Sequence, residues 1–478
     1  MSPSSPAAKR LAPRRSFGQL HLSRLTLVLS VVLGYASSVQ AQGGPLSLSD
    51  ALKTAAFEHP SVAARIKERG AAEARLDVAN RQKLPALVGQ SGVDGLGNRT
   101  ATFRIEQALW TGGRIDGEIS SAQAGIRRAD HVVAAAQNDI MLKVLNAFTE
   151  LARVQARQQA ARSNVDEHLR LAQMIERRVD SNISPASDGV LASARFSQAK
   201  AELNQLEALA IRSRSTLGQA LGRPVVSIAL PEQRNMGQYS LEVLVKTALD
   251  YAPSLQQLAA ELDAARADVE VKKSVALPQV KLRVDRTVGG AFPNTQAYVA
   301  LEYQTGAGLS AYAAVREAEA RVDAAALQAE AARRDLTDSV SADWADYRSF
   351  AVQVRDLEKQ VESTTSVFDS FVRQYAVGRK GWTDVLNAQR EVAQARYQLA
   401  DAVWGQFRAA VRLQIVTGMV SPDNMLLVQS RDQTRSLVLA EPVATPPADA
   451  VAVTAPAPAP ISEPAVVPVL QAPARTGW

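Results

Sequence analysis

The chain has 478 residues, with 54 basic and 48 acidic side chains and no cysteine. The lack of cysteine excludes disulfide scaffolds, cysteine-based metal sites and a lipid anchor attached through cysteine. The net charge of +6 is small for this length, and basic residues alternate with acidic ones, unlike the basic stripe of a nucleic-acid-binding protein. Abundant alanine and few aromatic residues favour closely packed helices.

Residues 1–41 have the three parts of a secretory signal peptide. Basic residues lead, an apolar run follows at 25–33, and Val39-Gln40-Ala41 has the small residues of a cleavage site. The apolar run is too short to span a bilayer comfortably. We therefore expect the mature chain to be exported and to contain no later transmembrane helix.

Two halves of the chain repeat in the same order. The matching pairs include Lys53-Thr54-Ala55 with Lys246-Thr247-Ala248, Leu84-Pro85 with Leu277-Pro278, and Asp188 with Asp384. An ordered series of pairs indicates a duplicated unit, far longer than a solenoid repeat. We predict a signal peptide at 1–41, a first repeat at 42–236, a second repeat at 237–421, and a Pro/Ala-rich disordered tail at 422–478.

Each half is predicted to begin with a helix and a β-hairpin. The helical segments, at 48–83 and 241–275, end at a Leu-Pro, where proline stops a helix. Segments with period-2 alternation follow, in which Val280, Leu282 and Val284 alternate with Lys281, Arg283 and Asp285. This alternation predicts strands of roughly ten residues with one apolar and one charged face.

The alternating strands fit two kinds of sheet. A half-buried sheet in a soluble protein has this pattern. A transmembrane barrel has it too, with apolar side chains toward lipid and polar ones toward a water-filled lumen. Four strands cannot close a barrel within one chain, so the second interpretation requires several chains, because lipid cannot satisfy an open sheet edge.

A very long helix is predicted after each hairpin, followed by a return helix. In the first half Ile115, Ile119, Ala122 and Ile126 follow the 4–3 spacing of a coiled coil. The pattern continues to about 179 and 375, which corresponds to a helix of about 100 Å. Breaks at 182–190 and 375–386 then precede return helices at 190–221 and 385–417. A soluble antiparallel coiled coil explains these helices but not the hairpins.

In this order of elements the chain resembles the TolC family of outer-membrane export channels. The match rests on the duplicated halves, the Leu-Pro before each hairpin, Trp110-Thr-Gly-Gly-Arg114, and the paired segments 187–195 and 377–389. The resemblance implies an α+β membrane protein. Each chain of a homotrimer gives four transmembrane β-strands to a twelve-stranded barrel in the outer membrane. The helices form a long coiled-coil tunnel through the periplasm, closed at its tip.

The resemblance also implies transport without covalent chemistry. A periplasmic adaptor (membrane fusion protein) and an inner-membrane ABC transporter or proton-driven pump are the expected partners, and no cofactor is expected. The histidines are scattered without metal-ligand spacing, and neither a phosphate-binding loop nor a nucleophile elbow is present. We therefore predict that the protein is not an enzyme.

The breaks between the helices are the candidate functional site. The resemblance implies that Asp384 lies in an acidic ring around the closed aperture, and that Asn387 replaces the second acidic residue and weakens this ring. It also implies a tip latch and an adaptor-docking turn. The latch residues are Tyr375, Lys380 and Asp188, with an ion pair between the last two, and the docking residues are Val377, Gly378, Arg379 and Gly381. The acidic residues Asp188 and Asp384 fit helix N-caps equally well.

The expected cargo is a protein. The segment from Val377-Gly378 to Leu386 resembles family members that serve type I secretion, so we expect export of a protein such as an RTX toxin of the cyclolysin or haemolysin kind. An efflux channel for drugs or other small molecules is the alternative with the same fold. A soluble periplasmic coiled-coil scaffold is the alternative from another class.

Overall fold

The computed structural model describes residues 44–93, 97, 99–231, 236–289, 294–303, 306–422 and 424. The chain divides into two compact units, Met1–Leu427 and Val428–Trp478, and described residues occur only in the first. The predicted signal peptide and nearly all of the predicted tail lie outside the described residues.

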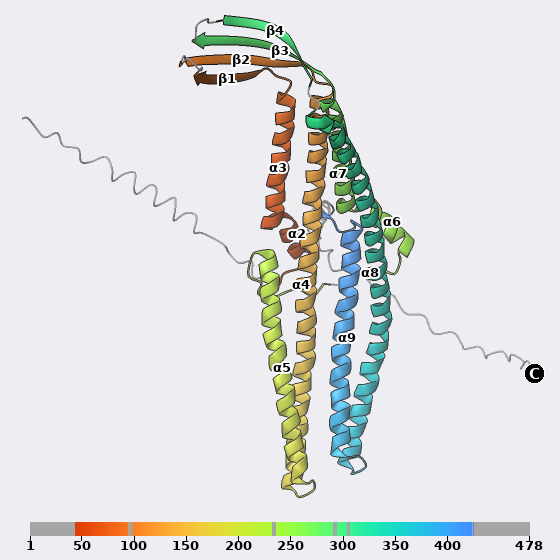
Figure 1. Cartoon of the computed structure of the whole chain (residues 1–478). Helices are drawn as coiled ribbons and strands as arrows, with labels where there is room; N and C mark the ends of the chain where they lie inside the picture. The colour runs from red at the N-terminus through yellow and green to blue at the C-terminus, as the bar shows by residue number, and fades with distance from the viewer. Residues whose placement is uncertain are drawn as a thin grey trace, which may run out of the picture. The chain divides into compact units, whose positions relative to one another are not determined.

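The same series of helices and strands occurs twice along the chain (Figure 1). The first series is α2 (Leu48–Glu58), α3 (Pro60–Arg81), β1 (Ala86–Val93), β2 (Arg99–Trp110), α4 (Arg114–Asp180) and α5 (Ala186–Leu221). The second is α6 (Leu241–Tyr251), α7 (Pro253–Val275), β3 (Gln279–Gly289), β4 (Asn294–Glu302), the short 3-10 helix η1 (Ala307–Leu309), α8 (Ser310–Ala376) and α9 (Trp382–Val416). The exact limits of the predicted repeats remain a prediction.

The first helical segment of each half is two helices, not one as predicted. Pro60 and Pro253 each occupy the first turn of a new helix, α3 and α7. Proline disfavours helical backbone in the residue before it, and His59 accordingly has φ −69° and ψ 133°. The ring nitrogen of His59 then accepts a hydrogen bond from the Ser61 N–H at 3.1 Å, which caps the second helix.

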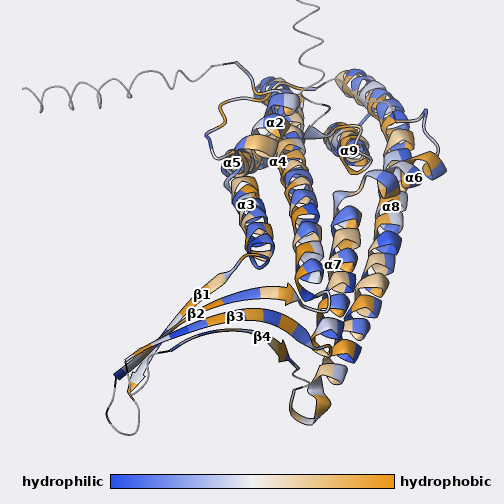
Figure 2. Cartoon of the chain, turned by 90° about the horizontal axis from the view of Figure 1, so that it is seen from above, coloured by the Kyte–Doolittle hydropathy of each residue, from blue (hydrophilic) through white to orange (hydrophobic). Residues whose placement is uncertain are grey.

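The strands form one antiparallel sheet in the order β1-β2-β3-β4. The two hairpins are joined through β2 and β3, where Arg104 lies opposite Asp285 and Glu106 opposite Arg283. Hydrophobic and hydrophilic residues are interleaved along these strands, as the hydropathy colours of Figure 2 show. Salt bridges connect neighbouring strands on the charged face, where Arg283 binds Glu106 of β2 at 2.9 Å and Glu302 of β4 at 3.0 Å. The predicted two-faced strands are confirmed.

The apolar face of the sheet is exposed in the single chain. Phe103 and Ile105 of β2 are 51% and 48% exposed, and Val299 and Leu301 of β4 are 63% and 72% exposed. A soluble sheet buries its apolar face against a second layer, and no described helix covers these residues. The sheet therefore presents an apolar surface that needs a cover outside this chain.

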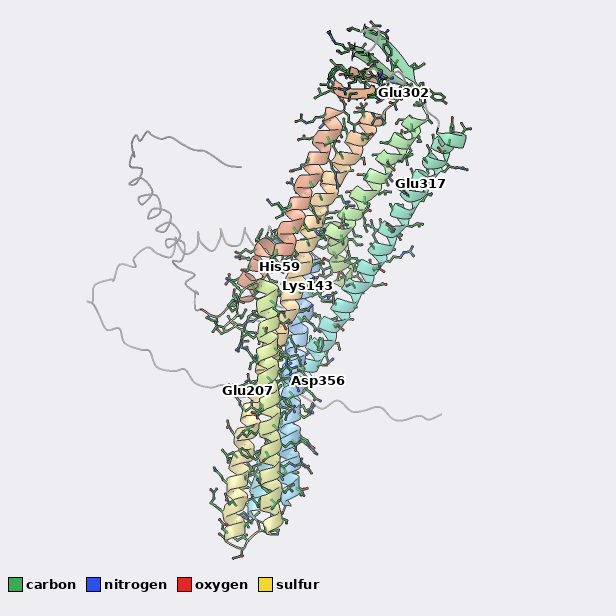
Figure 3. All side chains as sticks on the ribbon, turned by 60° about the vertical axis from the view of Figure 1, so that its left-hand side comes forward. His59, Lys143, Glu207, Glu302, Glu317 and Asp356 are labelled. Carbon is green, nitrogen blue, oxygen red and sulfur yellow. The ribbon has the colours of Figure 1, made fainter. Side chains whose placement is uncertain are left out.

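Helices α4 and α8 each contain 67 residues, which corresponds to about 100 Å, as the heptad pattern predicts. Each extends from the sheet to a turn at the opposite end (Figure 1). Figure 3 shows Glu302 at the sheet, Glu317 on α8 near it, and Asp356 farther along α8 toward the turn. Helix α5 packs against α4 and α9 against α8, while α4 also contacts α7 and α9.

The main core lies where the short helices meet the middle of α4. Met141, Leu145 and Phe148 of α4 are fully buried there against α2, and Phe407 and Val411 of α9 join them. Burial of each such side chain contributes about 1.5–3 kcal/mol. This core fixes α4 against α9 and so aligns the two helical hairpins. None of the helices in the described part of the chain is both long enough and apolar enough to cross a membrane.

Candidate functional site: the two helical turns

The turn between α8 and α9 is a tight reversal built on Gly378. Helix α8 ends at Ala376, and Gly378 adopts φ +73°, a left-handed conformation that glycine enters without steric cost. The Arg379 N–H then donates to the Gln374 carbonyl at 2.9 Å, which satisfies one of the free carbonyls at the helix end. The turn is therefore fixed by its own backbone.

The turn between α4 and α5 has the same backbone bonds with different residues. Asn182 adopts φ +57° in place of glycine, as asparagine does more readily than most residues. The Ile183 N–H donates to the Arg178 carbonyl at 2.8 Å. Helix α5 begins at Ala186 after Pro185. The two turns are thus alike in backbone but differ in the side chains they present.

Tyr375 joins the two turns. Its side chain is buried, and its hydroxyl lies 3.1 Å from the Ser184 hydroxyl in the first turn. The Arg178 guanidinium lies 5.0 Å from the centre of its ring, a cation–π distance. The Trp382 ring packs against it at 5.2 Å. The predicted latch residue Tyr375 therefore contacts the first helical hairpin within the same chain.

Lys380 and Asp188 do not form the predicted ion pair within the chain. The Lys380 ammonium lies 4.4 Å from the centre of the Phe371 ring instead. Asp188 lies in the first turn of α5, half-buried, and takes part in none of the ion pairs found among the described residues. An ion pair between Lys380 and Asp188 of two different copies remains a prediction.

The predicted aperture residues lie on the first turns of α9. Asp384 is half-buried and accepts a hydrogen bond from the Gly381 N–H at 3.1 Å. Helix α9 begins at Trp382, three residues before the predicted start, so Asp384 is its third residue and not its N-cap. Asn387 is exposed and accepts a hydrogen bond from the Arg390 guanidinium at 3.3 Å.

The predicted docking residues form the exposed end of the second turn. Val377 is 70% exposed, and Gly378, Arg379 and Gly381 are exposed as well. In the first turn Ile183 is 63% exposed. Both turns thus present one aliphatic side chain on a rigid backbone. Their part in docking an adaptor remains a prediction.

Buried polar side chains join α4 to α9 a few helical turns away from the two reversals. The Gln389 amide donates to the Asn164 side chain at 3.0 Å, and both residues are buried. His168 lies one turn further along α4 and is 6% exposed. Burial lowers the pKa of its imidazole, and the nearby Arg195 adds to this effect, whereas Glu167 opposes it. This histidine is therefore neutral at pH 7.

Several residues of this site are not predicted from the sequence. Ser184, Arg178 and Phe371 contact the latch residues, and Trp382 packs behind them. Of these residues, only Trp382 could have been suspected from the sequence, because a large aromatic side chain beside a turn tends to be buried against its neighbours. The other three are common on helix surfaces, so their role depends on which helices meet.

Solved structures with this arrangement are outer-membrane channels. The chain aligns with the outer-membrane channel OprN over 78% of its own length and 89% of that chain, with a TM-score of 0.69 and 20% identity. It aligns with VceC, an outer membrane protein of Vibrio cholerae, over 77% of its length and 96% of that chain, with a TM-score of 0.69 and 16% identity. The fold is therefore that of an outer-membrane channel.

The family model for outer membrane efflux proteins matches residues 51–223 and 244–419, so the chain belongs to this family. The cobalt-zinc-cadmium resistance protein CzcC of Cupriavidus metallidurans is 26% identical over 78% of this chain and 90% of its own length. TolC of Vibrio cholerae is 23% identical, over 65% and 75%. The alkaline protease secretion protein AprF of Pseudomonas aeruginosa is 22% identical, over 63% and 66%. Members are passive channels, not enzymes.

Proposed function

We propose that three copies of this chain form the exit duct of a tripartite export system in the outer membrane. The observation that carries this proposal is the placement of the sheet and the turns at opposite ends of two 67-residue helices. A helix of this length extends about 100 Å, far beyond the hydrocarbon thickness of a bilayer. The sheet then lies in the membrane and the turns lie deep in the periplasm.

The open edges of the sheet support assembly from several chains. Strands β1 and β4 each have a partner on one side only, and an unpaired edge is not tolerated in lipid. Pairing β1 of one copy with β4 of the next closes the sheet and covers every edge. The exposed apolar face, with Val299 and Leu301, then contacts lipid, and the charged face with Arg283 lines the water-filled interior.

The turns are the gate and the docking end of this duct. Asp384 and Asn387 lie on the aperture, and Val377, Gly378, Arg379 and Gly381 form the end that meets a periplasmic adaptor. Tyr375 holds the second hairpin to the first in the closed state, and Lys380 reaches Asp188 of a neighbouring copy. Such an exposed ion pair contributes up to about 1 kcal/mol, weak enough for an adaptor to break.

The proposed cargo is a protein exported by type I secretion, such as an RTX toxin, through an inner-membrane ABC transporter. The turn sequence supports this choice, as does the similarity to the protease-secretion protein AprF. Export of metal ions is the second candidate, favoured by the match to CzcC across 90% of that protein. Efflux of drugs through a proton-driven pump has the same architecture.

A gene deletion separates these cargoes. We expect the deletion strain to lose one large secreted protein from its culture medium and to regain it when the gene is restored. Growth in Co²⁺, Zn²⁺ and Cd²⁺ and in a panel of drugs serves as the comparison. An unchanged set of secreted proteins, together with raised metal or drug sensitivity, contradicts the type I assignment and leaves the duct itself in place.

A further inference from the structure

A polar groove lies between the two helical hairpins, next to the proposed aperture. Its volume is about 210 Å³, with α4 contributing His168, α5 contributing Arg195 and Glu202, and α9 contributing Asn387 and Arg390. Asn387 is one of the two proposed aperture residues. The groove is therefore continuous with the proposed gate, and its charges act on whatever passes there.

The two guanidinium groups of this groove are not neutralised by carboxylates. Arg390 donates to the neutral Asn387 amide at 3.3 Å, and Arg195 donates to the neutral Gln198 amide at 2.9 Å. Neither arginine belongs to any ion pair found among the described residues. Glu202 is the one carboxylate among the described residues that line the groove. The lining therefore keeps a net positive charge at neutral pH.

The proposed aperture residues carry little negative charge compared with these two arginines. One oxygen of Asp384 accepts a hydrogen bond from the Gly381 N–H at the start of α9, where the partial positive charge of the helix N-terminus offsets part of the carboxylate's charge. Asn387 carries no charge. Arg390 lies three residues after Asn387, and residues at this spacing share one helix face. Each copy of the chain thus places two arginines without carboxylate partners near two carboxylates, Glu202 in the groove and Asp384 at the proposed aperture.

We propose that Arg195 and Arg390 are specificity-determining residues of this channel, which offset its acidic residues and so weaken its preference for cations. This inference rests on the proposed function, because it requires Asn387 and Asp384 to lie on the conducting path. Rings of charged side chains set the ion selectivity of narrow pores. A constriction with low-dielectric walls strengthens the potential of such rings.

The test is the reversal potential of the full-length protein in a planar bilayer under a KCl gradient. We expect the wild-type channel to show little preference between K⁺ and Cl⁻. Arg195→Gln and Arg390→Gln should each raise the permeability ratio of K⁺ to Cl⁻ by about threefold, and the double variant should raise it further. Block by hexaamminecobalt(III) should occur at a lower concentration in both variants.

Two further variants separate charge from structure. Arg390→Lys keeps the charge and should keep the wild-type ratio, so a shift in this variant overturns the proposal. Arg212→Gln removes an exposed arginine elsewhere on α5 and should have little effect. An unchanged ratio in the double glutamine variant, with normal conductance, also overturns the proposal.

The same recording distinguishes this inference from the function on which it rests. Asp384→Ala should shift the ratio toward Cl⁻ if the aperture is placed correctly. If the protein fails to conduct, or if Asp384→Ala leaves the ratio and the cation block unchanged, the proposed duct or its aperture is wrong. If Asp384→Ala acts as expected while the arginine variants do not, only the role of the arginines is wrong.

Discussion

Tyr375 shows how one side chain couples the two halves of the site. Its ring packs on Trp382 of its own hairpin, and its hydroxyl lies 3.1 Å from that of Ser184 in the other. The ring contributes apolar burial, whereas the hydroxyl contributes one hydrogen bond between the hairpins. These contributions can be separated by substitution, because phenylalanine retains the first and loses the second.

Substitution of Tyr375 should loosen the closed gate in two steps. Tyr375→Phe removes one hydrogen bond worth about 1 kcal/mol and should raise the closed-state conductance slightly. Tyr375→Ala also empties a buried aromatic site, at about 3–5 kcal/mol, and should produce a large leak. Conductance in planar bilayers measures both effects. A wild-type conductance in the alanine variant would show that Tyr375 does not hold the gate.

His168 should make the packing of α4 against α9 sensitive to acid. Its pKa is lowered from the ordinary value of 6.5 by burial, with Arg195 adding to the shift. Below about pH 6.5 the unfolded chain therefore binds a proton that the folded chain resists. Stability is fully present above this pH, falls as the pH drops, and levels off below the folded pKa.

The pH dependence of unfolding measures this effect. The free energy of unfolding should fall as the pH drops below about 6.5, and His168→Gln should reduce this slope. His131→Gln alters a half-buried histidine on the same helix and serves as the control. The same slope in the wild type and in the His168 variant would mean that other groups control the acid response.

At the scale of elements, the two turns share one backbone conformation but differ in the residue at the left-handed position. The left-handed position is Asn182 in the first turn and Gly378 in the second. Both turns carry the same backbone hydrogen bond, from Ile183 and from Arg379 to a carbonyl five residues earlier. Both breaks can be located from the sequence. Helix α9 begins three residues earlier than predicted, because Gly381 is its N-cap and Asp384 lies inside the first turn, where it accepts the Gly381 N–H.

The first turn predicts which substitutions the second accepts. Gly378→Asn should change stability little, since Asn182 already occupies the matching position. Gly378→Val should destabilise the turn by about 1–2 kcal/mol, because a β-branched residue fits the left-handed conformation poorly. Thermal unfolding of the purified protein checks both variants. Equal loss in the two would show that the backbone conformation does not limit this site.

At the scale of the whole molecule, the sheet is incomplete in one chain. Strands β1 and β4 have free edges, and Leu87 and Val299 on these strands are 73% and 63% exposed. The register of the strands places both residues on the apolar face of the sheet. The proposed trimer brings these two edges together, so it can be tested by covalent capture.

Cysteine pairs should capture the trimer without background, because the chain contains no cysteine. Leu87→Cys combined with Val299→Cys is the first pair, and neighbouring positions on β4 cover other registers. Oxidation should give bands of two and three linked chains in denaturing gels of outer-membrane fractions. Either single variant should remain a monomer. Monomers alone across the whole set of pairs would contradict the proposed edge pairing.

Much of the fold could be predicted from local patterns. The long helices follow from the spacing of Ile115, Ile119 and Ala122, and the two-faced strands follow from the alternation around Leu282 and Val284. The apolar pattern predicts one continuous helix at the start of each half. Pro60 and Pro253 instead begin a second helix there. The residues of both turns could be predicted from the sequence, but not which side chains of the two hairpins meet.

The sequence by itself determined the duplication, the long helices, the strands and the positions of both turns. Apart from the duplication, which comes from comparing the two halves, each of these features depends on residues close together in the chain, so the pattern that specifies it is local. Only the tertiary structure decided that Tyr375 meets Ser184, that Gln389 meets Asn164, and that Lys380 packs on Phe371 rather than pairing with Asp188. The contacts of Tyr375 and Gln389 join residues 191 and 225 positions apart, whereas Lys380 and Phe371 belong to the same hairpin. The partners of Tyr375 and Gln389 are selected by the burial and alignment of whole helices.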